Sequence, residues 1–77
     1  MMQNAPHSLS IQIASVPDRD ELVAEIWDSD DLLAEVCILG ELPQIEIYPR
    51  RDHAPWKLSL TQLSEAMQAA VDKLRSR

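Results

Sequence analysis

Residues 22–39 read LVAEIWDSDDLLAEVCIL, two short apolar runs on either side of an acidic cluster, and their interpretation decides the fold. Leucine, alanine and glutamate favour helix, so the two runs can be interpreted as a helical pair. We prefer a β-hairpin, because each run is short for an isolated helix and because β-branched residues and Trp27 favour strand. The cluster DSDD at 28–31 is typical of a turn between the two strands.

Alternation along this hairpin assigns its side chains to two faces. The first face carries Leu22, Ala24, Ile26, Leu32, Ala34, Val36 and Ile38. The second face carries Val23, Glu25, Trp27, Leu33, Glu35, Cys37 and Leu39. Like faces meet only when the loop has an odd number of residues, so we predict a three-residue loop from Ser29 to Asp31. This register sets Glu25 opposite Glu35, a like-charge pair that solvent, a slip by two residues or a partner must relieve.

The segment before the hairpin predicts a first strand. Residues 8–15, SLSIQIAS, alternate with period two, and their apolar side is formed by Leu9, Ile11 and Ile13. Residues 16–20, VPDRD, interrupt the pattern because Pro17 cannot donate to a strand ladder, so we predict a turn there. Residues 1–7 are polar and are expected to form a disordered tail.

The segment after the hairpin predicts a fourth strand and a loop. Gly40 is the only glycine and marks the turn that leads into it. Residues 44–49, QIEIYP, place Ile45 and Ile47 toward the core and Glu46 and Tyr48 outward. Residues 49–57, PRRDHAPWK, form a loop stiffened by two prolines, and we expect Trp56 to dock into the core just before the next element.

The C-terminal segment predicts an amphipathic helix from about Leu60 to Arg75. Ser59 and Gln62 match the S-x-x-Q capping box, and Leu58 and Leu63 are placed for a hydrophobic staple. An apolar stripe recurs at three- and four-residue steps, formed by Leu60, Leu63, Met67, Ala70 and Leu74. Short turns between the strands imply an antiparallel meander, and a single helix must cover its more apolar face. We therefore predict an α+β fold, a four-stranded antiparallel meander with one C-terminal helix packed on one face (ββββα), in a single domain of 77 residues.

Composition excludes several classes of function. Thirteen acidic residues against seven lysines and arginines give a net charge of −6, which argues against nucleic-acid binding. No apolar stretch is long enough to span a membrane. Cys37 is the only cysteine, which excludes an internal disulfide and fits the cytoplasm, and His7 and His53 show no metal-ligand spacing. No phosphate-binding, nucleophile or zinc-protease motif is present, so we expect neither a cofactor nor catalysis.

The second face of the predicted sheet is the candidate binding surface. It mixes acidic, aromatic and aliphatic side chains, and the residues we select are Val23, Glu25, Trp27, Leu33, Glu35, Glu46 and Tyr48. Such a mixture favours a non-enzymatic accessory protein that binds a basic protein partner. Three alternatives stay open: a homodimer formed through this face or an edge strand, a small enzyme or metal carrier that uses the glutamates, and a face covered by the 49–57 loop.

A longer stretch carries a family resemblance. Residues 45–70 follow the pattern IEIYPR-x4-PW-x-L-x-L-x2-L-x-EAM-x2-A, which is similar to a pattern in small, acidic bacterial proteins of uncharacterised function. Those proteins often have glycine where this sequence has His53. The resemblance implies a compact accessory protein and transfers no activity and no catalytic residue. In size and charge such proteins are similar to immunity proteins that block toxins, so an immunity-type inhibitor is one form that partner binding could take.

Overall fold

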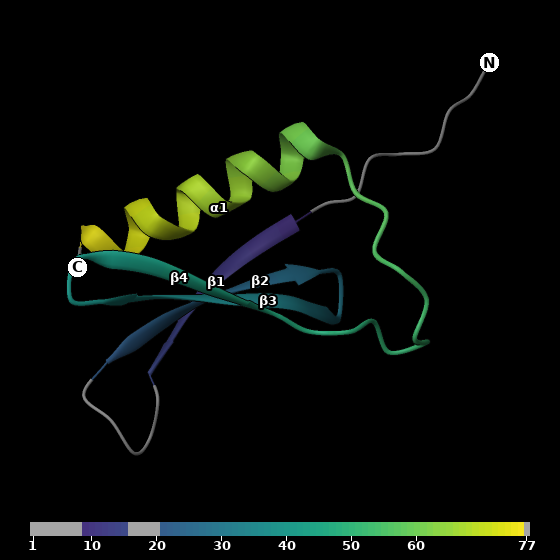
Figure 1. The fold of residues 1–77 in the computed structure, drawn as a ribbon, viewed down its shortest axis with the longest axis horizontal. Helices are drawn as coiled ribbons and strands as arrows, with labels where there is room; N and C mark the ends of the chain where they lie inside the picture. The colour runs from purple at the N-terminus through teal and green to yellow at the C-terminus, as the bar shows by residue number, and fades with distance from the viewer. Residues whose placement is uncertain (1–8, 16–20, 77) are drawn as a thin grey trace.

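The computed structural model describes residues 9–15 and 21–76, so the predicted tail at 1–7 and the predicted turn at 16–20 lie outside the described residues. Its elements are β1 (Leu9–Ser15), β2 (Leu22–Asp28), β3 (Asp31–Leu39), β4 (Leu42–Ile47) and α1 (Leu60–Arg75). The strands form one antiparallel sheet in the order β1-β2-β3-β4, and α1 lies on one face of it (Figure 1). The predicted ββββα architecture is confirmed, and the helical-pair interpretation of residues 22–39 is wrong.

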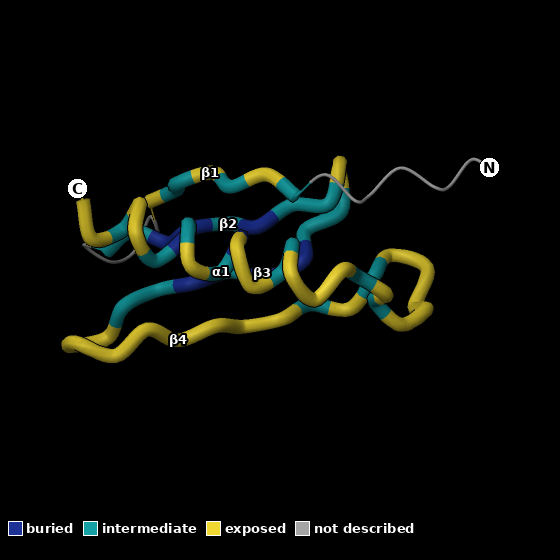
Figure 2. Tube along the Cα trace, turned by 90° about the horizontal axis from the view of Figure 1, so that it is seen from above, coloured by how far each residue is buried: buried dark blue, intermediate teal, exposed yellow. Residues whose placement is uncertain are grey.

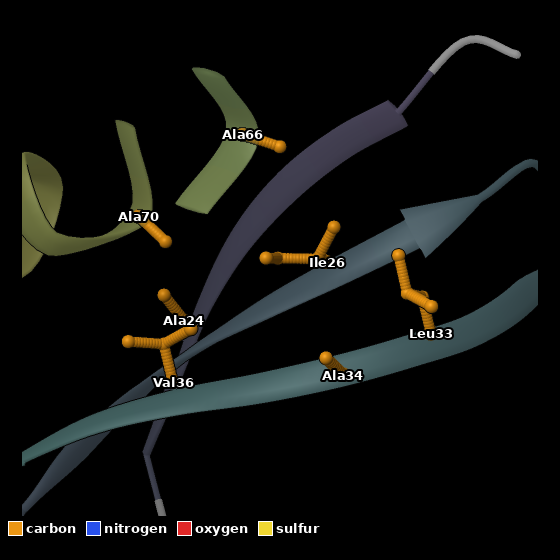
Figure 3. Close-up of a cluster of buried hydrophobic side chains, with 7 residues drawn as sticks. All are labelled: Ala24, Ile26, Leu33, Ala34, Val36, Ala66 and Ala70. Atoms are coloured by element: carbon orange, nitrogen blue, oxygen red, sulfur yellow. The ribbon is translucent and has the colours of Figure 1, made fainter. Parts of the chain in front are cut away.

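The core lies between α1 and the middle of the sheet. The Ser59 hydroxyl caps α1 by accepting the backbone N–H of Gln62 at 3.1 Å, which confirms one half of the predicted capping box. The reciprocal bond is not formed, because Gln62 Oε1 has no hydrogen-bond partner. The helix meets the sheet through small side chains, since Ala66 and Ala70 point toward Ala24 and Ile26 in Figure 3. Alanines at this contact let the helix lie close to the strands. The buried cluster consists of Ala24, Ile26, Leu33, Ala34, Val36, Ala66 and Ala70.

The β2–β3 hairpin reaches its register by a different route from the predicted loop of three residues. The turn has only two residues, Ser29 and Asp30, and Asp28 pairs with Asp31. The pairing then shifts by one residue between Ile26 and Trp27, and Glu25 lies opposite Glu35 as predicted. A two-residue turn alone would have set unlike faces together. The β-bulge adds the third residue that the parity of the pairing requires.

The bulge exchanges two neighbouring leucines between the faces. Leu32 pairs with Trp27, so it lies on the face away from α1, where the alternation had placed Leu33. Leu33 is instead only 2% exposed and belongs to the core cluster under α1. The assignment of Leu33 to the binding face is therefore wrong, because strict alternation fails where a strand carries an extra residue.

The helix covers only part of the sheet. It packs on β1, β2 and β3, whereas every residue of β4 is exposed, as the tube in Figure 2 shows. Ile45 and Ile47 lie on the helix side of the sheet as predicted, but they are not buried there: they are 40% and 61% exposed. β4 also begins at Leu42, two residues earlier than predicted, and includes Pro43.

The loop between β4 and α1 returns the chain to the helix side. Trp56 packs against the core cluster, and its Nε1–H donates to the Tyr48 carbonyl at 2.7 Å, which confirms its predicted docking before the helix. The start of the loop is held at the β2–β3 turn by Arg51. The Arg51 guanidinium group donates to the backbone carbonyl of Asp30 and forms an ion pair with the Asp30 carboxylate at 3.4 Å. His53 has φ +63°, a left-handed conformation that favours glycine.

Candidate functional site

A row of carboxylates crosses the face of the sheet that lies away from α1. The strand register sets Glu25 opposite Glu35 and Glu35 opposite Glu46, so one glutamate stands on each of β2, β3 and β4. Gln12 of β1 extends the row to the far edge of the sheet. Neighbouring strands are about 4.8 Å apart, so the three charges lie close together. We call this surface, defined by Glu25, Glu35 and Glu46 with Trp27 and Tyr48, the open face.

Two aromatic side chains hold the glutamates in place. The Trp27 Nε1–H donates to Glu25 Oε1 at 3.1 Å, and the Tyr48 hydroxyl donates to Glu35 Oε1 at 3.0 Å. Both rings are half-buried, and neither packs under α1. A carboxylate accepts several hydrogen bonds through its two oxygens, so each pair keeps acceptor capacity for donors from a partner.

The glutamates alter the acid–base chemistry of Tyr48. Desolvation, the hydrogen bond to Glu35 and the negative charges of Glu35 and Glu46 raise the pKa of Tyr48 to about 12. Its hydroxyl is therefore a neutral hydrogen-bond donor at physiological pH. It serves to orient Glu35 and is a poor candidate for a nucleophile or a general base.

A shallow hollow of about 170 Å³ lies beside the row. Its lining residues come from β2, β3, β4 and the residue before β2, and they are Glu21, Val23, Glu35, Cys37, Leu39, Gln44, Ile45 and Glu46. Acidic and aliphatic side chains line it together, and none of these residues is a lysine or an arginine. A lysine or arginine side chain has the matching chemistry, an aliphatic stem with a cationic end.

The two arginines of the 49–57 loop are engaged elsewhere. Arg50 forms an ion pair with Asp52 at 3.1 Å and lies over the Trp56 ring, 5.6 Å from its centroid. Arg51 is bound to Asp30 at the β2–β3 turn. These contacts hold both guanidinium groups at the loop and the turn, so the loop does not bring its positive charge to the open face.

The structure brings together most of the residues selected from the sequence. Glu25, Trp27, Glu35, Glu46 and Tyr48 lie on the open face, and Leu33 does not. Val23 lies on the same side of the sheet, but it is only 7% exposed. Sequence reasoning missed Leu42, which is 68% exposed and lies opposite Leu39 on the same face. A two-residue turn at Gly40 and Glu41 would have revealed that pairing, because Gly40 has the positive φ, +66°, that such turns need.

Other kinds of site find no support in the described part of the chain. Residues 9–15 and 21–76 contain no group of three or more histidine, cysteine, aspartate or glutamate side chains that could hold a metal ion. Among the same residues, no helix is long and apolar enough to cross a membrane. Comparison of the chain with protein-family models, with curated proteins and with solved structures finds no match.

Proposed function

We propose that this chain is a non-enzymatic protein-binding domain whose open face engages a basic segment of a partner protein. The observation that carries the proposal is the unbroken register of Glu25, Glu35 and Glu46 across three strands on a face that α1 leaves bare. Like charges directly opposite one another destabilise a sheet, so the row is more favourable once cations from a partner lie against it.

The aromatic side chains on this face provide the other half of a binding site. Trp27 and Tyr48 are half-buried and fixed by hydrogen bonds to Glu25 and Glu35, so little side-chain entropy is lost when a partner contacts them. Tryptophan and tyrosine are enriched among the residues that dominate binding energies, and acidic groups around them accelerate encounter with a basic partner. Inhibition of a basic toxin or enzyme, as by an immunity protein, is the form of function that such a surface suits best.

The proposal is tested with a short lysine-rich peptide as the probe. The double variant Glu25→Gln/Glu35→Gln should bind the peptide at least several-fold more weakly than the wild type, and its affinity should depend less on salt concentration. When the peptide is added to the wild type, the NMR signals of backbone amides in β2, β3 and β4 should change their chemical shifts, and those of α1 should not.

A matched control separates the site from the charge of the whole molecule. Glu41→Gln/Glu65→Gln removes the same two charges from exposed positions outside the row. It should leave most of the affinity intact. Equal weakening by the two double variants would show that the peptide responds only to net charge, and the open face would lose its role.

A second candidate function is self-association. The specific observation in its favour is the exposed edge strand β4, which carries two exposed isoleucines.

A further inference from the structure

β4 is the uncovered edge of the sheet. β1, the opposite edge, has its apolar side chains Leu9, Ile11 and Ile13 packed against the core under α1. On β4, Ile45 and Ile47 line a crevice of about 240 Å³, whose remaining lining comes from β3, from the loop before α1 and from α1 itself. An exposed strand with an apolar side is a template for pairing with another strand.

The backbone groups of β4 alternate between β3 and the open edge. The Tyr48 N–H donates to the Leu33 carbonyl at 2.9 Å, which fixes the phase of the alternation. The N–H groups of Ile45 and Ile47 therefore turn to the open edge. Pro43 has the same phase as these isoleucines, so its missing N–H removes nothing from the β3 ladder.

The sequence of β4 is self-complementary about Ile45. When a second copy lies antiparallel with Ile45 opposite Ile45, the two residues exchange both of their edge hydrogen bonds. The Ile47 N–H then reaches the Pro43 carbonyl of the second copy, so all four edge donors of the pair are used and the absent proline donor is not needed. On the helix side, Pro43, Ile45 and Ile47 of each copy meet the same three residues of the other.

Charge selects this register over its neighbour. With Ile45 at the centre, Gln44 lies opposite Glu46 of the second copy, and an amide meets a carboxylate. A pairing centred on Glu46 would use the same donors but would set two carboxylates directly opposite each other, which is unfavourable. A pairing centred on Ile47 would set Ile45 opposite Pro49, which lies beyond the end of β4, so fewer residues of the two strands would be paired.

We infer that the chain forms a two-fold symmetric dimer in which β4 pairs antiparallel with β4 of a second copy, with Ile45 on the axis. The sheet then runs continuously through eight strands, from two copies of four, and each glutamate row continues across the axis through the contact of Glu46 with Gln44. This inference develops the self-association candidate and does not depend on a basic partner at the open face.

The first test removes one edge donor. Ile45→Pro removes an N–H that faces the open edge, together with the isoleucine side chain, and leaves the β3 ladder intact; Pro43 shows that a proline of this phase fits β4. Sedimentation equilibrium of the full chain over a range of concentrations should show a dimer for the wild type and for Ile45→Val, and a monomer for Ile45→Pro. A wild type that stays monomeric at its highest concentration would overturn the inference, and so would an unchanged dimer in Ile45→Pro.

The second test examines which residues of the two β4 strands lie opposite one another. Its variants leave the apolar side chains on the helix side of β4 unchanged. Gln44→Lys sets an ammonium group of each copy against Glu46 of the other and should tighten dimerisation by about two- to thirty-fold, whereas Gln44→Glu should weaken it by a similar factor. Gln12→Lys, on the same face at the β1 edge, makes the same change in net charge and should leave the dimer close to wild type. Equal effects of the two lysine variants would exclude the register centred on Ile45. Because Glu25 and Glu35 are unchanged in all these variants, the result is distinct from the test of the open face.

Discussion

Tyr48 connects the strand pairing to the electrostatics of the open face. Its N–H extends the β3–β4 ladder, and its hydroxyl donates to Glu35. The fold raises the pKa of Tyr48 from 10.0 to about 12, so the neutral form is favoured in the folded state. The contribution of this pKa shift to the free energy of unfolding is fully present below pH 10, and it is lost as the pH rises from 10 to about 12.

Tyr48 is the only tyrosine of the chain, so the absorbance of its phenolate reports one pKa. We expect a midpoint near 12 for the wild type and a lower midpoint for Glu35→Gln, which replaces the charged carboxylate acceptor by a neutral amide. Tyr48→Phe should lack the loss of stability between pH 10 and 12 in urea unfolding. A midpoint at 10 in the folded wild type would show that the hydroxyl is not held by Glu35.

His53 occupies a backbone conformation that costs free energy for any residue with a Cβ atom. Its φ of +63° lies in the left-handed region, and its N–H donates to the Arg50 carbonyl at 3.0 Å. His53→Gly should raise the free energy of unfolding by up to about 1 kcal/mol, since the strain of about 1–2 kcal/mol exceeds the added entropy of glycine in the unfolded chain. His53→Ala, which keeps the Cβ atom, should show no such gain in urea unfolding. Equal stability of the glycine and alanine variants would argue against strain at this position.

Among the secondary-structure elements, the β2–β3 hairpin has the clearest test of its geometry. The bulge places Leu33 in the core and Leu32 on the open face. Leu33→Ala should therefore lower the free energy of unfolding by about 2–4 kcal/mol, whereas Leu32→Ala should cost roughly 1 kcal/mol because that side chain is only half-buried. The reverse order of these two costs would mean that the strands alternate without a bulge.

For the molecule as a whole, the uneven distribution of charge affects stability. The net charge is −6, and three glutamates lie side by side on one face. Raising the salt concentration from about 0.01 M to about 0.15 M shortens the screening length from about 30 Å to about 8 Å. The free energy of unfolding should rise, by an amount of the order of 1 kcal/mol, because repulsion in the compact state is reduced.

A pair of variants shows where that repulsion originates. Glu25→Gln/Glu46→Gln leaves one charge in the row and should gain less stability from salt than the wild type. Glu41→Gln/Glu65→Gln removes the same charge from exposed positions elsewhere and should behave more like the wild type. A salt response that depends only on net charge would contradict the idea that the row concentrates the repulsion.

Local sequence patterns were sufficient for the element order and for most of the open face. Alternation placed Glu25, Trp27 and Glu35 on one side of the hairpin, and the requirement that like faces meet set Glu25 opposite Glu35. The Ser59 cap and the apolar stripe located α1 from its first residue to its last. These features depend on interactions between residues close in sequence, so period and capping chemistry are enough to find them.

The face of Leu33, the exposure of Ile45 and Ile47, and the open edge of β4 were decided by the tertiary structure. A two-residue turn followed by a bulge satisfies the same parity as a three-residue loop, and only the packing of Leu33 under α1 distinguishes the two. One helix is narrower than a sheet of four strands, and small alanines seat it over β1 to β3. Which strand remains uncovered depends on where the helix lies across the sheet, a relation between distant segments that no local pattern contains.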